Sequence, residues 1–243
     1  MIRFLLAAPF LILAAYSVYA SFRYTRMISN IFMGLVYRSD WKPSAPTRGE
    51  RLVILDSSDR EIPALTSGEG RGGRLALFCH ESGHGKESWE RYAAFLADAG
   101  YRILAIDFDE KTDKGQKNSL SQWPYEGDVE RVLTAVRWAK KAYEPASALV
   151  LFGVSKGANV ALAASARLTT PSIVIADGLF SMKEIFRDYI RKWAPILVKP
   201  NLFGDHTPDW VVNVFAALGF WHCQRRSGKK FIDVERCLRQ KHA

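Results

Sequence analysis

The stretch Ala148–Ala163, which reads ALVLFGVSKGANVALA, decides the fold of this chain. Its first part, Leu149–Phe152, has the length and branched apolar side chains of a buried strand. The alanine-rich segment Ala158–Arg167 favours a helix. Between them lies the pentapeptide GVSKG, a G-x-S-x-G pattern in the order strand, sharp turn, helix. At the tip of so tight a turn the hydroxyl of Ser155 would stand clear of the sheet, beside a helix N-terminus that favours negative charge.

Charge is distributed unevenly along the 243 residues, whose formal net charge is +9. Residues 1–50 carry six basic and two acidic side chains, and residues 222–243 carry seven and two. The middle, residues 51–221, has 21 of each sign and is neutral. A nucleic-acid-binding domain would cluster basic charge on its folded face, so this pattern favours attraction to a membrane surface instead.

The first 24 residues are predicted to form a membrane anchor. Phe4–Phe22 is nineteen residues long and contains no charge, which suffices to span a bilayer as a helix. A cleaved signal peptide is the alternative, because Val18–Ala20 resembles a small-residue cleavage site and would make the protein secreted or periplasmic. The basic residues that follow the apolar run outnumber Arg3, which favours a cytoplasmic domain over the opposite orientation.

Residues 25–50 are predicted to be a juxtamembrane segment and linker, and the pattern changes at Arg51. Short apolar runs predict strands at 51–55, 61–65, 75–79, 102–108, 149–152 and 172–176. Amphipathic or alanine-rich runs predict helices at 87–99, 125–143, 158–167, 182–193, 208–220 and 231–240. This alternation predicts an α/β fold, with a mostly parallel sheet covered by helices on both faces over residues 51–243. Within it, residues 181–221 are a candidate lid and 222–243 a basic tail.

Cysteine and cofactor patterns are uninformative. Cys79, Cys223 and Cys237 show neither metal-ligand spacing nor a disulfide framework, and Cys79 is expected in the core. No nucleotide-binding loop, metal cluster or haem motif is present in the sequence, so no cofactor and no metal is implied.

Four segments together resemble the α/β-hydrolase superfamily, in particular serine hydrolases of the dienelactone-hydrolase and serine-aminopeptidase-like type. They are FCHESG at 78–83, GYRILAIDF at 100–108, the GVSKG pentapeptide and ADGLF at 176–180, in the family's order. The resemblance covers about residues 51–221. It implies that Ser155 is the nucleophile and that the Lys156 backbone N–H is one donor of the oxyanion hole. It places the second donor at Ser82, and it makes His80 a structural histidine of its loop.

The same resemblance requires an acid and a base, in the chain order Ser, Asp/Glu, His. Similar enzymes carry them after a seventh and an eighth strand, and neither strand is recognisable here. Asp177, at the end of the sixth strand, is a candidate acid. His222 is the candidate base among the histidines downstream of Ser155, although no recognisable strand precedes it. His84 is expected to be a solvated loop residue.

These observations predict a membrane-anchored serine hydrolase that cleaves an ester, thioester or amide through a Ser155 acyl-enzyme. The fold is expected to be incomplete at its C-terminal end, and the chain as given inactive or incomplete, because the strands that carry the acid and the histidine are not recognisable. The alternative is a non-catalytic, membrane-associated interaction protein that keeps the hydrolase scaffold. A sheet that ends at the sixth strand would expose an apolar edge, so a partner that covers this edge is expected.

Overall fold

The computed structural model describes residues 2–34, 41–42, 47–108, 122–144, 149–197 and 206–241. The chain forms two compact units, residues 1–35 with 183–228, and residues 36–182 with 229–243. We describe each unit separately.

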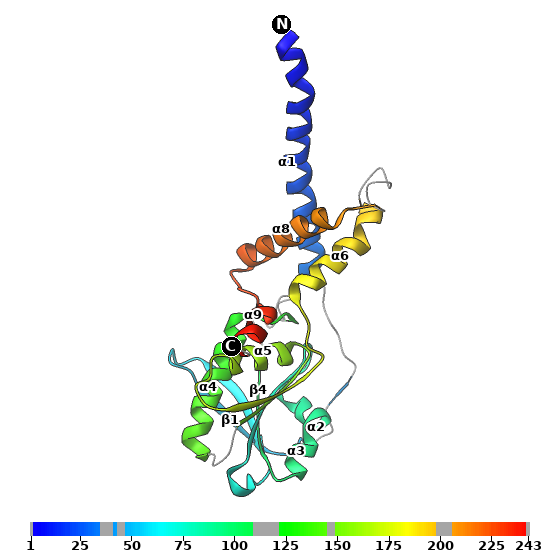
Figure 1. Ribbon diagram of the computed structural model, residues 1–243. Helices are drawn as coiled ribbons and strands as arrows, with labels where there is room; N and C mark the ends of the chain where they lie inside the picture. The colour runs from blue at the N-terminus through cyan, green and yellow to red at the C-terminus, as the bar shows by residue number, and fades with distance from the viewer. Residues whose placement is uncertain are drawn as a thin grey trace. The chain divides into compact units, whose positions relative to one another are not determined.

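The larger unit is built on a six-stranded sheet with the order β1-β2-β4-β3-β5-β6 (Figure 1). Its strands are β1 (Glu50–Leu55), β2 (Glu61–Ser67), β3 (Leu75–Cys79), β4 (Arg102–Ile106), β5 (Leu149–Val154) and β6 (Ser172–Asp177). The strands β1 and β2 form an antiparallel hairpin, and β2 pairs antiparallel with β4. The remaining neighbours β4, β3, β5 and β6 are parallel. The predicted mostly parallel sheet is therefore confirmed.

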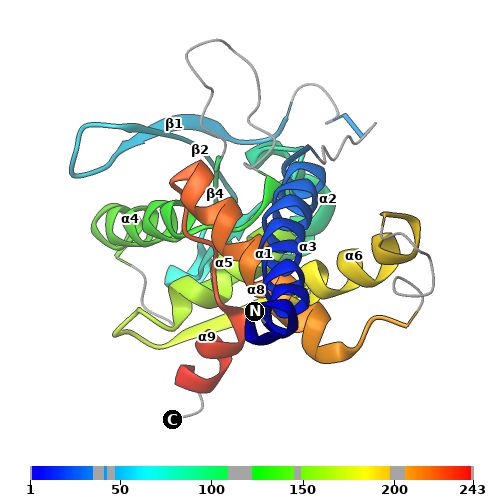
Figure 2. The same cartoon turned by 90° about the horizontal axis from the view of Figure 1, so that it is seen from above.

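Alternate side chains of the central strands enter two different cores. Leu77 of β3 and Leu151 of β5 face one core, which also contains Val132 of α4 (Glu126–Tyr143) and Val160 of α5 (Lys156–Ser165). Their neighbours along the chain face the second core, where Phe78 packs with Trp89 of the short helix α2 (Trp89–Tyr92) and Leu96 of the short helix α3 (Ala94–Asp98). The pleat of the strands thus places helices on both faces, and α4 and α5 lie side by side on one of them (Figure 2).

The helices of this unit lie where the sequence pattern predicts them, apart from one break. They are α2 (Trp89–Tyr92), α3 (Ala94–Asp98), α4 (Glu126–Tyr143), α5 (Lys156–Ser165) and α9 (Val234–Lys241). The single helix predicted at 87–99 is broken at Ala93, whose φ of −118° and ψ of 6° are not helical. Ala148, which precedes β5, lies outside the described residues.

Most of the predicted basic tail, residues 222–243, is folded into helices. Its first residues, up to Ser227, extend the helix that the sequence predicted to end at Phe220. Beyond them, Phe231, Ile232 and Val234 are buried in the larger unit. The Ile232 N–H donates to the Pro124 carbonyl at 3.2 Å, and α9 packs on α5. The buried apolar residues Phe231, Ile232 and Val234 therefore decide where this segment packs, rather than its seven positive charges.

The smaller unit contains α1 (Ile2–Gly34), α6 (Met182–Leu197) and α8 (Asp209–Ser227). In it α8 packs across α1 (Figure 1), and the Ser29 hydroxyl donates to the Gly219 carbonyl at 3.4 Å. The Phe32 ring stacks on Phe186 of α6 with centroids 4.0 Å apart. The predicted helix over 4–22 is present as part of α1. Over the described residues, however, no helix combines the length and the apolar character needed to cross a bilayer, so the predicted membrane span is not supported.

Strand β6 pairs with β5 along one side and with no other strand of the described residues. It is less buried than the neighbouring β5, and 54 % of the Ile173 side chain is exposed. Among the described strands, β6 is thus an open edge, as the sequence predicted.

Candidate active site

Ser155 lies at the tip of the turn that joins β5 to α5. Its φ of 52° and ψ of −115° fall in a region that residues with a side chain rarely adopt, so this turn is strained. The Ser155 N–H donates to the Asp177 carbonyl at 2.7 Å, and the Ser155 carbonyl accepts from the Ala158 N–H at 3.0 Å. These two hydrogen bonds hold the turn between β6 and the first turn of α5.

The glycines two residues before and after Ser155 allow three backbone segments to meet. A Cβ at Gly153 would lie 2.2 Å from the Gly157 carbonyl oxygen, and one at Gly157 would lie 2.0 Å from the Cys79 oxygen. Real Cβ atoms do not approach oxygen so closely, so any larger residue would push the elbow away from β3. The G-x-S-x-G pattern is therefore required by packing as well as by the turn.

The predicted oxyanion donors flank this turn. Lys156 opens α5, and the first N–H groups of a helix point out of its N-terminus, so the position of the Lys156 N–H fits its predicted role as an oxyanion donor. Ser82 follows β3, the strand next to β5, and its hydroxyl donates to the Gln122 carbonyl. This bond fixes the Ser82 side chain, and its backbone N–H stays a predicted donor.

The loop that carries Ser82 is fixed by two buried side chains. The His80 Nδ1 donates to the Glu81 carbonyl at 2.7 Å, and its Nε2 accepts from the Phe108 N–H at 3.1 Å. Both ring nitrogens therefore hold the loop, which agrees with a structural role for His80. The expectation of a solvated His84 is wrong, because its side chain is only 7 % exposed and its Nδ1 lies 2.6 Å from the Glu81 carboxylate.

Asn159 connects the elbow to the loop after β6. Its side chain is fully buried, its Nδ2 donates to the Phe180 carbonyl at 2.9 Å, and its Oδ1 accepts from the Phe180 N–H at 3.2 Å. The Phe180 ring in turn contacts Trp123 edge-on at 6.3 Å, next to Gln122. The loops around Ser155 are therefore linked to one another. This link could not be predicted from the sequence, because Asn159 looks like an ordinary polar residue of a helix.

The side chain of Lys156 forms a buried ion pair that the sequence did not indicate. Its Nζ lies 2.9 Å from the Asp128 carboxylate of α4, and the two side chains are 1 % and 0 % exposed. The ammonium also lies 5.1 Å from the Phe108 ring centroid and 5.5 Å from that of Tyr125. The predicted oxyanion donor is thus anchored through its own side chain.

Burial raises the pKa of Asp128 to about 6, against the opposing effect of the Lys156 ammonium, from an ordinary value of 3.8. The native carboxyl therefore holds its proton at a higher pH than the unfolded one. Between about pH 4 and pH 6 the native state binds more protons, so this group's contribution to the free energy of unfolding falls as pH rises.

We therefore expect the stability advantage of the wild type over the double variant Asp128→Leu/Lys156→Met to decrease between pH 4 and pH 6. The decrease should reach up to about 3 kcal/mol. Urea unfolding of both proteins across this pH range measures the difference in the free energy of unfolding. The other titratable groups are present in both proteins, so their contributions cancel. An advantage that is constant or grows with pH would contradict the raised pKa.

Of the two predicted partners of Ser155, Asp177 lies in the same unit and His222 in the other. Asp177 pairs with Val154 in the β5–β6 register, and its carbonyl holds the Ser155 N–H, while the residue itself is exposed. His222 lies in α8 of the other unit, where it lines a cavity with residues of α1. Within the described part of the chain, no hydrogen bond joins a histidine side chain to Ser155. The acid and the base stay predictions.

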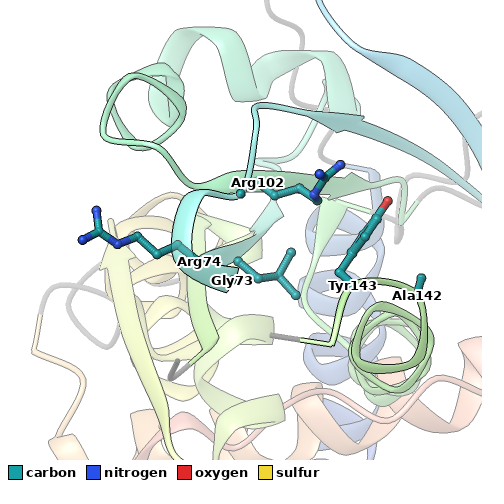
Figure 3. A pocket seen from close by; sticks show the side chains of 7 residues that line it. Gly73, Arg74, Arg102, Ala142 and Tyr143 are labelled. Atoms are coloured by element: carbon teal, nitrogen blue, oxygen red, sulfur yellow. The ribbon is translucent and has the colours of Figure 1, made fainter. Parts of the chain in front are cut away.

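A separate cavity of about 240 Å³ lies at the amino ends of β3 and β4. Figure 3 shows the Arg102 side chain directed toward Tyr143 and the Arg74 side chain extending away from it. The Arg102 guanidinium stacks 4.6 Å above the Tyr143 ring. Ser155 follows the carboxyl end of a strand parallel to β3, so this cavity is at the opposite end of the sheet and does not serve the nucleophile.

Comparison with known structures identifies the fold. The Pyrococcus furiosus esterase Pf2001 matches 85 % of this chain and 70 % of its own, with 18 % identity and a TM-score of 0.50. The fold is that of the α/β-hydrolases. A dienelactone hydrolase from Anabaena variabilis also matches, with 21 % identity and a TM-score of 0.44 over 53 % of this chain and 62 % of its own. No protein-family model matches the chain.

Proposed function

We propose that this protein is a serine hydrolase that cleaves an ester, thioester or amide of a small molecule through a Ser155 acyl-enzyme. The observation that carries the proposal is the strained backbone of Ser155, maintained between two glycines that tolerate no side chain. Backbone strain of this kind persists only where the surrounding structure enforces it, and it is concentrated at functional sites. The esterase with the same fold adds support.

In the proposed reaction the Ser155 Oγ attacks the carbonyl carbon of the substrate while a general base takes the hydroxyl proton. The carbonyl oxygen becomes an oxyanion, and the N–H groups of Lys156 and Ser82 stabilise it. Collapse of this intermediate breaks the bond to the leaving alcohol, thiol or amine, which takes up the proton. Water then attacks the acyl-enzyme in the same way, which releases the acid and restores Ser155. The predicted general base is His222, with Asp177 as the acid that orients it.

The proposal is tested by treating the purified full chain with a fluorophosphonate probe and mapping the adduct by mass spectrometry. Trypsin releases Ser155 in the peptide Ala142–Lys156, which also contains Ser147 as an internal control. We expect the adduct on Ser155, because the probe reacts only with an activated serine. An adduct on another residue would contradict the assignment of the nucleophile.

A non-catalytic scaffold is the second candidate. It is favoured by the two described histidines of the larger unit, His80 and His84, whose rings interact with residues of their own loop and with Phe108. The same labelling experiment separates the two functions. A folded chain that forms no adduct and hydrolyses no aryl ester would support the scaffold and reject the hydrolase.

Membrane attachment through residues 4–22 is a further part of the proposal. It is supported by the charge-free sequence of this segment and by exposed apolar side chains along α1, such as Phe10, Leu11 and Val18. Expression of the full chain and of a chain lacking residues 1–24, followed by carbonate extraction of the membrane fraction, tests it. The full chain should stay in the membrane pellet and the shortened chain in the supernatant; equal partition would reject the anchor. A partner on the open edge of β6 likewise stays a prediction.

A further inference from the structure

The smaller unit contains a cavity of about 630 Å³ between α1 and α8. Its size is within the range of roughly 300–1,000 Å³ that is usual for small-molecule sites. Part of its wall is apolar and comes from Phe22, Leu218 and Trp221. Trp221 is 53 % exposed and Phe22 is also exposed, so the wall is accessible from outside. These features fit an apolar chain that enters from solvent or from a lipid surface.

Two arginines at the same cavity supply positive charge. Arg225 lies over the Trp221 ring at 5.3 Å, and Arg226 donates to the Asn30 side-chain oxygen at 2.5 Å. Neither guanidinium forms an ion pair with a carboxylate of the described residues. Each has five N–H donors in a planar fork that matches a carboxylate or phosphate. The stacking of Arg225 and the hydrogen bond of Arg226 hold both side chains in place before a ligand binds.

A buried hydroxyl is the third feature. Thr25 of α1 lines the cavity, is only 8 % exposed, and its hydroxyl oxygen has no hydrogen-bond partner among the described residues. A buried polar group without a partner costs free energy, so such groups are rare unless a ligand or water satisfies them. Its presence beside the arginines indicates that the cavity is built for a ligand with polar atoms at one end.

We propose that this cavity binds a single acyl chain that ends in an anionic group, either a fatty-acid carboxylate or a phospholipid phosphate. The apolar wall holds the chain, the two arginines bind the anionic group, and Thr25 supplies a further hydrogen bond. The proposal concerns the smaller unit and does not require the reaction at Ser155, although His222, the predicted general base, also lines this cavity. The charge of the arginines selects an anionic amphiphile over a neutral or cationic one.

Calorimetric titration of the full chain with dodecanoate and with dodecanol tests the proposal. Both probes have the same hydrocarbon chain, and only dodecanoate carries a negative charge. The double variant Arg225→Gln/Arg226→Gln should weaken dodecanoate binding at least about tenfold and leave dodecanol binding unchanged.

Shortening the acid from dodecanoate to decanoate should weaken binding about fourfold per methylene removed. Lys192→Gln, which removes an exposed positive charge of α6 outside the cavity, should change neither.

Leu218→Trp fills the cavity and should abolish binding of both probes. Thr25→Val is nearly isosteric and keeps the fold testable if the larger substitution unfolds the unit; it should weaken dodecanoate binding without lowering the melting temperature. Failure of the wild type to bind dodecanoate, or equal effects of the arginine variant on both probes, would overturn the proposal.

The source of the ligand is distinguished with vesicles. Stronger binding to phosphatidylcholine vesicles that contain phosphatidylglycerol than to those without, lost in the arginine variant, assigns the cavity to membrane phospholipid. Binding of dodecanoate with no such difference between the vesicles assigns it to free fatty acids.

Discussion

Ser155→Ala is expected to lower kcat/KM for an aryl ester by about 10³-fold or more, with little change in stability. The alanine keeps a Cβ and therefore the same backbone strain, so the turn and its hydrogen bonds stay as they are. What is lost is the oxygen that forms the acyl-enzyme, and the activity that remains would come from binding and oxyanion stabilisation alone. Hydrolysis of p-nitrophenyl butyrate by the wild type and the variant measures the effect.

A matched serine in the same helix provides the control. Ser165, in the last turn of α5, is buried and donates to the Leu162 carbonyl at 2.8 Å. Ser165→Ala should cost some stability and leave kcat/KM unchanged. Equal turnover by wild type and Ser155→Ala would mean that another residue performs the reaction.

Asp128→Asn is expected to destabilise the protein by about 3–5 kcal/mol, because it leaves the Lys156 ammonium buried without a countercharge. The double variant Asp128→Leu/Lys156→Met should lose much less, since two apolar side chains of similar size can fill the same space without a desolvation cost. Urea unfolding of Asp128→Leu, of Lys156→Met and of the double variant measures the coupling between the two side chains.

Glu130→Gln is a control on the same helix. Glu130 pairs with Arg167 at 3.3 Å, but its side chain is largely exposed, so the loss should be below about 1 kcal/mol. If Asp128→Asn costs no more than Glu130→Gln, the buried pair does not hold the elbow in place.

The elbow could be predicted from sequence because its requirements are local. Five consecutive residues fix the turn, and the flanking apolar and alanine-rich runs identify the strand and the helix. The parallel sheet follows from the same alternation, and its predicted strands at β3 and β6 agree with the structure to within one residue. Short-range periodicity therefore accounts for the fold of the larger unit.

What the sequence did not reveal depends on contacts between distant residues. Lys156 and Asp128 are far apart in the chain, and a charged residue is ordinarily expected at the surface. His84 was expected to be exposed to solvent, because the residues around it in the sequence do not show that the Glu81 side chain is buried. The segment 222–243 was interpreted from its charge, although Phe231, Ile232 and Val234 determine where it packs.

A crystal structure of the fluorophosphonate adduct is the sharpest test of Ser155 as the nucleophile. We expect phosphorus bonded to the Ser155 Oγ, with Ser155 still at positive φ. We also expect a phosphonyl oxygen about 2.7–3.1 Å from the backbone nitrogens of Lys156 and Ser82. An adduct at another residue, or a Ser155 turn relaxed to negative φ with no donor near the phosphonyl oxygen, would contradict this assignment.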